Sequence, residues 1–285
     1  MSLPLAILNR IGRTILLLTL AALGTIALMR FAPGYFADAR EMDAKYGRGA
    51  RSELRAERAQ RGSVGMIASG AFAGWLHGNL GQSRQFEVPV SELLRPRLRV
   101  SASLLIRGVG YGWLLAFCTA LPLSATRGRA IWLGAPFTVL LAIPTAAMAT
   151  LCLLSGTGGP ALVLSLLLAA RDFKFLHRVM RVAWRSPHLL QARARGLRID
   201  QLVRGHLLPE LLPQVFALAS LSLITALSAI VPVEVIFNVP GVGQLAWTAA
   251  MNRDLPVLLT ITLLMAIGVL GAGVFSAPIR SVETA

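Results

Sequence analysis

The sequence has 285 residues, of which 55% are hydrophobic and 14% are charged, and its mean hydropathy is +0.65. These values exclude an ordinary soluble domain, in which about 25% of the residues are charged. The net charge is +15, but the basic residues lie between apolar runs without interleaved aromatic residues, which argues against nucleic-acid binding. The composition therefore predicts a membrane protein.

Apolar runs recur along the chain at lengths near the roughly 20 residues that a helix needs to cross about 30 Å of hydrocarbon. The six runs are 14–29, 100–125, 130–154, 160–170, 211–237 and 255–275. In lipid only helices satisfy their own backbone groups over such lengths, so the predicted fold class is all-α, with about six transmembrane helices. The fourth run is short. Either its helix continues through Arg171, Asp172 and Lys174, or neighbouring helices shield a thin span.

Basic residues in short loops predict the orientation, because short translocated loops contain few Lys and Arg. The stretch 171–210 holds nine basic and three acidic residues, whereas 156–159 carries no charge. We therefore expect 171–210 and both termini to be cytoplasmic. The predicted organisation is an N-terminal anchor helix with an external loop, residues 1–99, followed by a membrane core, residues 100–285.

The first apolar run is also compatible with a secretory signal peptide, with Arg10 and Arg13 as its charged region. Its sixteen uncharged residues are slightly long for that role, and no clear small-x-small cleavage pattern follows it. An uncleaved membrane anchor is the favoured interpretation.

One charge, Arg107, interrupts the second run, roughly 10 Å along the helix from Val100. Two interpretations remain open for it. The side chain either snorkels to the outer membrane interface or faces a transported solute as a pathway residue.

Signatures of the common enzyme classes are absent from the sequence. It has no Gly-x4-Gly-Lys-Ser/Thr phosphate loop, its four histidines lack metal-ligand spacing, and no Gly-x-Ser-x-Gly elbow is present. Cys118 and Cys152 fall inside predicted spans, where they are expected to be small apolar fillers. We therefore expect no catalytic site, no metal site and no bound cofactor.

The cationic stretch after the fourth run has a pattern of its own. As one continuous helix it would bring a partly apolar set into a narrow arc, namely Leu189, Ala192, Gly196, Ile199 and Val203. Such a face can dock into the groove of a partner, or the segment can lie on anionic lipid through its arginines. Gly196 costs about 1 kcal/mol relative to Ala in a helix interior, so a turn or a close backbone approach explains it better than lipid contact.

These residues resemble a known family. The run Ala192-Arg193-Ala194-Arg195-Gly196-Leu197, followed by His206 and Pro209, is similar to the cytoplasmic coupling loop of ABC importer permeases, and most of all to the dipeptide, oligopeptide and nickel branch. Downstream, the segment 234–245 resembles that branch's Glu-x-x-Phe-x-x-Pro-Gly-x-Gly-x-Leu signature. Its matching residues are Glu234, Phe237, Pro240, Gly241 and Gly243, with Leu245 in the last position.

Two further segments extend the resemblance. Arg253-Asp254-Leu255-Pro256 matches the branch's Arg-Asp-x-Pro, and Gly78-Asn79-Leu80-Gly81-Gln82-Ser83 is similar to its Gly-Asp-Leu-Gly-x-Ser segment. The chain departs from the branch at Glu210, where Asn is usual, and at Arg195, where Lys is usual. These departures prevent the transfer of a particular substrate.

The resemblance implies a permease subunit of an ATP-driven importer for peptides, nickel or metal chelates, or similar small solutes, in a bacterial-type inner membrane. In such importers two permease subunits form the pathway, two cytoplasmic ATPase subunits bind the permease loops, and an external solute-binding protein delivers the solute. The coupling residues that it implies here are Ala192, Ala194, Gly196, Leu197, His206 and Pro209. Small side chains at 192 and 196 are expected to let the ATPase surface approach.

A secondary transporter or channel that works without ATP is the alternative. Such proteins tend to carry intramembrane acids for ion coupling. Glu234 is the only acid within the six predicted spans, and its position inside the family-like signature favours a structural role for it.

Overall fold

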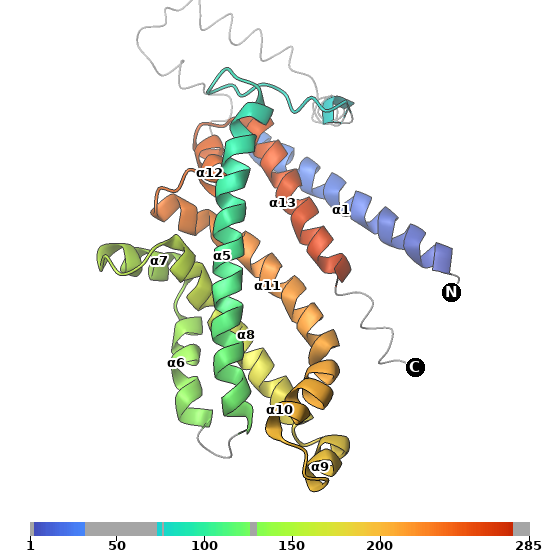
Figure 1. Ribbon diagram of the computed structural model, residues 1–285. Helices are drawn as coiled ribbons and strands as arrows, with labels where there is room; N and C mark the ends of the chain where they lie inside the picture. Colours follow the sequence, from blue (N-terminus) through green and yellow to red (C-terminus); the bar gives the residue numbers. More distant parts are fainter. Residues whose placement is uncertain (1–2, 32–72, 76, 126–129, 276–285) are drawn as a thin grey trace, which may run out of the picture. The chain divides into compact units, whose positions relative to one another are not determined.

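The computed structural model describes residues 3–31, 73–75, 77–125 and 130–275, which are helical apart from short connections and one isolated bridge between Gln82 and Pro89 (Figure 1). The predicted all-α class is confirmed. In chain order the labelled elements are α1 (Leu3–Phe31), α5 (Val90–Ala125), α6 (Ala130–Ala142), α7 (Thr145–Leu154), α8 (Pro160–Ala183), α9 (Pro187–Ala194), α10 (Ile199–Leu202), the π-helical turn η1 (Val203–Leu207), α11 (Leu208–Ile236), α12 (Val242–Met251) and α13 (Leu255–Phe275).

The chain forms two compact units. The first consists of residues 1–97 and 245–267, and the second of residues 98–244 and 268–285. Most of the external loop expected before residue 99 lies outside the described residues, and the division into 1–99 and 100–285 stays a prediction.

Three of the described helices are long and apolar enough to cross a membrane: Val90–Ala125, Ile199–Ile236 and Leu255–Gly273. The run 130–154, expected as one helix, is instead two helices, α6 and α7, bent by 101°. Pro144 lies at the break, where it lacks an N–H donor and keeps the preceding residue out of the α region. Counting the bent pair as one span gives up to four spans among the described residues, and the count of six stays a prediction.

The fourth apolar run continues as a helix through its polar residues. α8 extends to Ala183, and one side of it is buried at every fourth residue, at Leu164, Leu168, Asp172, Leu176 and Met180. Residues 171–183 therefore belong to α8, and the cationic loop predicted for 171–210 begins only after this helix.

Small residues on α5 allow α8 to approach closely. They recur every four residues, at Gly108, Gly112, Ala116 and Ala120. A Cβ atom added to Gly112 would lie 3.0 Å from both the Cβ of Leu168 and the backbone oxygen of Ser165. The two helices could not keep this separation with larger side chains at these positions.

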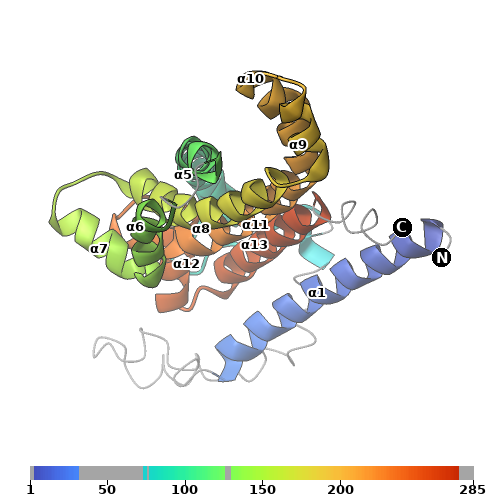
Figure 2. The same cartoon turned by 90° about the horizontal axis from the view of Figure 1, so that it is seen from below.

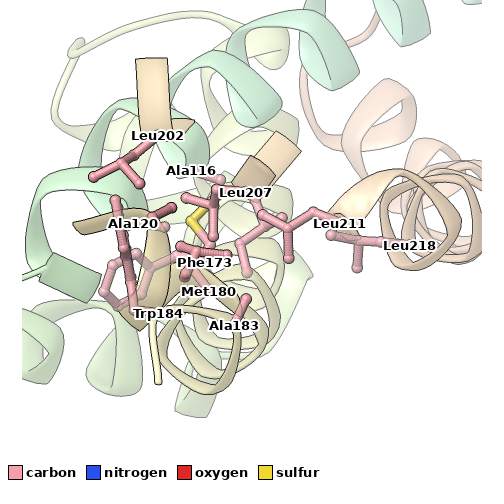
Figure 3. Close-up of a cluster of buried hydrophobic side chains, with 13 residues drawn as sticks. Ala116, Ala120, Phe173, Met180, Ala183, Trp184, Leu202, Leu207, Leu211 and Leu218 are labelled. Atoms are coloured by element: carbon pink, nitrogen blue, oxygen red, sulfur yellow. The ribbon is translucent and has the colours of Figure 1, made fainter. Parts of the chain in front are cut away.

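A buried apolar cluster joins α5, α8, α9, α10 and α11 in the second unit, and Figure 3 shows its side chains. The Trp184 indole closes one end of this cluster and donates a hydrogen bond from Nε1 to Ser124 Oγ at 3.0 Å. Polar contacts add to the packing of α8 on α11, because Ser222 Oγ donates to Asp172 Oδ2 at 2.8 Å and Arg171 Nη1 donates to the Leu221 carbonyl at 3.1 Å. Through this cluster α9 and α10 are packed against α5, α8 and α11.

The first unit has a smaller core. Ala22 and Ile26 of α1 pack against Leu255, Leu259 and Leu263 at the start of α13. The N-terminal apolar run therefore packs against α13, and its interpretation as an uncleaved anchor stays a prediction.

Candidate functional site

The cationic segment folds as two short helices between α8 and α11. Figures 1 and 2 show α9 and α10 beyond the C-terminal end of α8, far from α7. α9 ends at Ala194, two residues before Gly196, whose φ of +81° is left-handed. The Gly196 N–H bonds to the Arg193 carbonyl at 2.9 Å and the Leu197 N–H to the Ala192 carbonyl at 3.4 Å, a pattern that closes a helix at a glycine. The continuous helical arc expected for 189–203 is wrong, and the turn expected at Gly196 is present.

The break at Gly196 changes which side chains face outward. Leu189, Ala192 and Leu202 are buried in the core of the second unit, and Ala192 is only 5% exposed. Ala192 therefore does not lie on an exposed docking face, contrary to the sequence-based expectation. On α9 and α10 the exposed large apolar side chains are Leu190 at 52% and Ile199 at 75%.

The small and polar residues of the predicted coupling set take different positions. Ala194 and Gly196 are exposed and Leu197 is half-buried. His206 is half-buried in η1. Pro209 lies in the first turn of α11, so it opens the next helix, which is one of the two roles expected for it.

Two side-chain contacts fix α9 to its neighbours. The Arg193 guanidinium lies 4.6 Å from the centroid of the Trp184 ring, a cation–π contact with the end of α8. His188 Nε2 lies 3.1 Å from Glu210 Oε2 in the first turns of α11. Glu210 is one of the positions at which the sequence departs from the branch pattern, and here it provides a contact between the two helices.

Glu234 lies at the centre of a second cluster, near the end of α11. Its side chain has no exposed surface. Oε1 accepts a hydrogen bond from Ser101 Oγ of α5 at 2.6 Å, and Oε2 accepts from the N–H groups of Gly243 at 2.7 Å and Gln244 at 3.3 Å. Ser101 Oγ in turn accepts from the Val242 N–H at 2.8 Å. The carboxylate therefore joins α5, α11 and the first turn of α12, where the helix dipole favours a negative charge.

The glycines of this signature make room for the carboxylate. A Cβ atom on Gly241 would overlap the Glu234 carboxylate, and one on Gly243 would lie 2.7 Å from the Val231 Cα. Phe237 ends α11, and Pro240 follows in the turn before α12. These contacts give Glu234 the structural role that the sequence favoured.

Residues of two weaker family segments meet in the first unit. Ser83 Oγ donates to Asp254 Oδ2 at 2.5 Å, and the Gln85 N–H donates to the same oxygen at 3.2 Å. Both Ser83 and Asp254 are buried. The sequence identified both segments, but it did not predict the contact between Ser83 and Asp254, because neither segment's residue pattern contains information about its tertiary partner.

Arg107 lies on α5 beside an open cavity of about 480 Å³. The cavity is lined by Arg107, Leu104 and Tyr111 of α5 and by residues 159–162 and Ser165 at the start of α8. Arg107 Nε donates to the Ser103 carbonyl at 3.2 Å and Nη2 donates to Ser103 Oγ at 3.0 Å. Among the described residues, Arg107 is the only charged one that lines this cavity.

The family comparison accounts for the arrangement of the second unit. Residues 100–279 match the family described as the binding-protein-dependent transport system inner membrane component. The chain belongs to this family. It is therefore a multi-pass inner-membrane permease, and the match includes α5 from residue 100 onward, the cationic segment and the Glu234 cluster.

Known proteins similar to this permease include named peptide permeases. A peptide permease protein from Brucella suis biovar 1 (strain 1330) is 28% identical over 230 residues, which cover 68% of this chain and 72% of the relative. The oligopeptide transport system permease protein OppB of Escherichia coli (strain K12) is 31% identical over 107 residues, 37% of this chain and 35% of the relative.

A solved structure of the methionine ABC transporter MetNI, in an inward-facing conformation, contains a chain with the same fold. Its TM-score is 0.59 at 20% sequence identity, over 67% of this permease and 97% of that chain. At this identity the similarity establishes the fold alone.

Proposed function

We propose that this permease is one membrane-spanning subunit of an ATP-driven importer for peptides. The family match over residues 100–279 carries the proposal, and the named peptide permeases among its relatives support the choice of peptides. The proposed partners are a second permease subunit, cytoplasmic ATPase subunits and an external solute-binding protein. Nickel or metal chelates remain the second candidate cargo only through the sequence resemblance.

The proposed contact with the ATPase is the exposed side of α9 and α10. Leu190 and Ile199 present apolar surface there, while Leu189, Ala192 and Leu202 fix the opposite side to the core of the permease. A motion of the ATPase would thus be transmitted to α8 and α11 through a packed element. The partner would bind apolar side chains at the centre of the contact and the exposed arginines at its edge.

The test uses charge substitutions on the exposed side. We expect Ile199→Glu and Leu190→Glu, each in the complete complex, to lower ATPase co-purification and peptide uptake at least about tenfold, because each buries an unpaired charge at the contact. The matched control is Arg198→Ala. Arg198 pairs with Asp200 at 3.6 Å with both side chains mostly exposed, and such pairs contribute only about 0–1 kcal/mol.

Normal ATPase binding and uptake by Ile199→Glu would contradict the coupling role of this segment. ATP hydrolysis that does not respond to a peptide-loaded binding protein in the wild-type complex would contradict the importer assignment itself.

A further inference from the structure

We propose that the cavity beside Arg107 binds a carboxylate of the transported solute, such as the C-terminal carboxylate of a peptide. The proposal rests on the importer function proposed above and names the chemistry of one contact in its pathway. It is carried by the lining of the cavity, by the orientation of the guanidinium and by the position of Arg107 in an apolar helix.

The cavity has the size and lining of a small-molecule site. Its volume of about 480 Å³ falls within the usual range for ligand pockets of roughly 300–1,000 Å³. Leu104, Pro160 and Leu162 provide apolar walls, and Tyr111 brings one phenol group. With Arg107 as the only charge, the lining is complementary to an amphipathic solute with one negative group.

Arg107 is held in place by its own helix. Both hydrogen bonds of its guanidinium go to Ser103, one turn earlier on α5, and among the described residues no carboxylate forms an ion pair with it. These two bonds use two of the five N–H donors, so the others remain for a ligand. A planar guanidinium that is already oriented matches a carboxylate with two parallel hydrogen bonds.

The surroundings of the cavity strengthen its preference for an anion. Residues 159–162 form the N-terminal end of the 24-residue helix α8, and Gly159 provides no side-chain cap there. The partial positive charge of this helix end adds to that of Arg107. Because an arginine is costly within an apolar span, a contact with solute gives a reason for a charge at this position.

The experiment compares two peptides that differ only at the C-terminus, one with a free carboxylate and one with an amide. Uptake is measured in proteoliposomes that contain the complete transporter and its binding protein. For Arg107→Gln we expect the KM of the free peptide to rise at least tenfold relative to wild type, with the KM of the amidated peptide changed less than twofold. A preference of the binding protein for one of the two peptides does not affect the result, because the KM of each peptide is compared between the variant and wild type.

Two further variants separate the site from general effects of charge. Arg99→Gln removes the same charge two turns nearer the start of α5, from an exposed side chain that does not line the cavity, and its KM values should equal those of wild type. Arg107→Lys keeps the charge but loses the planar pair of donors, so the KM of the free peptide should rise by an intermediate factor.

The outcomes distinguish the possible ligands. Equal KM changes for both peptides in Arg107→Gln, or no change in either, would overturn the carboxylate site and indicate contact with lipid phosphate or water at the interface. Wild-type proteoliposomes that import neither peptide would contradict the proposed importer function, and with it this assignment. A carboxylate-dependent KM shift in Arg107→Gln but not in Arg99→Gln would establish the site.

Discussion

Glu234 shows how a single buried charge organises part of this permease. Its two carboxylate oxygens accept hydrogen bonds from one side chain and two backbone N–H groups, which belong to different helices. Hydrogen bonds to a charged acceptor contribute about 1.5–3 kcal/mol each, and a buried N–H without an acceptor costs a similar amount. Glu234 therefore links α5, α11 and α12, and its removal would leave several buried donors without an acceptor.

Removal of this charge should destabilise the permease more than removal of its neutral partner. Glu234→Gln replaces an acceptor oxygen with an amide group that cannot accept from both Gly243 and Ser101, and we expect a loss of about 2–3 kcal/mol. Ser101→Ala removes one hydroxyl and should cost about 1 kcal/mol. The measurement is the midpoint temperature of unfolding in detergent. Equal midpoints for Glu234→Gln and wild type would show that the carboxylate is not required.

At the scale of elements, Gly196 determines where α9 ends and which side of α10 is exposed. A Cβ atom at Gly196 meets no other atom within 4 Å, so the constraint is its φ of +81° and not a lack of space. An L-residue in the left-handed region costs roughly 1–2 kcal/mol.

Backbone strain rather than side-chain bulk should therefore decide the effect of mutations at Gly196. We expect Gly196→Ala to weaken ATPase association nearly as much as Gly196→Trp, measured by co-purification of the complex. The matched control is Gly205→Ala in η1, where a Cβ also meets nothing within 4 Å and the φ is not positive. If Gly196→Trp disrupts the complex while Gly196→Ala does not, side-chain size and not backbone strain determines the effect, and a partner surface lies directly on Gly196.

The elements could be predicted from sequence where apolar length or a family motif marked them, and not where tertiary contacts determined them. Hydropathy located α5, α11 and α13. Hydropathy placed Asp172 outside a span, because a count of apolar residues in a short window treats a charge as the sign of a loop. The apolar residues spaced four apart from Leu164 to Met180 nevertheless continue through this position. Pro144 was visible in the sequence, but a 101° bend depends on what packs against α6 and α7.

The same distinction holds for the candidate site. The Glu234 signature and the cationic segment proposed for coupling were recognised from their residues, but the inward position of Ala192 was not. Once Gly196 interrupts the helix, the arc that relates Ala192 to Ile199 no longer exists, and helical periodicity cannot report which face is buried. The cavity beside Arg107 also depends on the start of α8, which is more than fifty residues away in sequence.

At the scale of the whole molecule, the bend between α6 and α7 makes the membrane topology a testable question. A bent pair either crosses the membrane as a broken span or enters and leaves it on the same side. The 156–159 connection lies on one side of the membrane in the first case and on the other side in the second. The direction of every later helix is reversed with it. The positive charge favours the broken span, because residues 184–210 carry five basic and two acidic residues while 156–159 carry none.

Two cysteines placed at the opposite ends of α8 decide between these topologies. In a background with Cys118→Ala and Cys152→Ala, Thr157→Cys and Gln191→Cys each introduce one exposed thiol. We expect a membrane-impermeant maleimide to label position 157 in intact spheroplasts, and to label position 191 only after the membrane is permeabilised. This result places α9 and α10 in the cytoplasm, where an ATPase can reach them. It also places the start of α8, which lines the cavity together with Arg107, toward the side from which a binding protein delivers solute. The reverse labelling would mean that α6 and α7 re-enter on one side, and it would remove both the coupling role of α9 and the solute contact at Arg107.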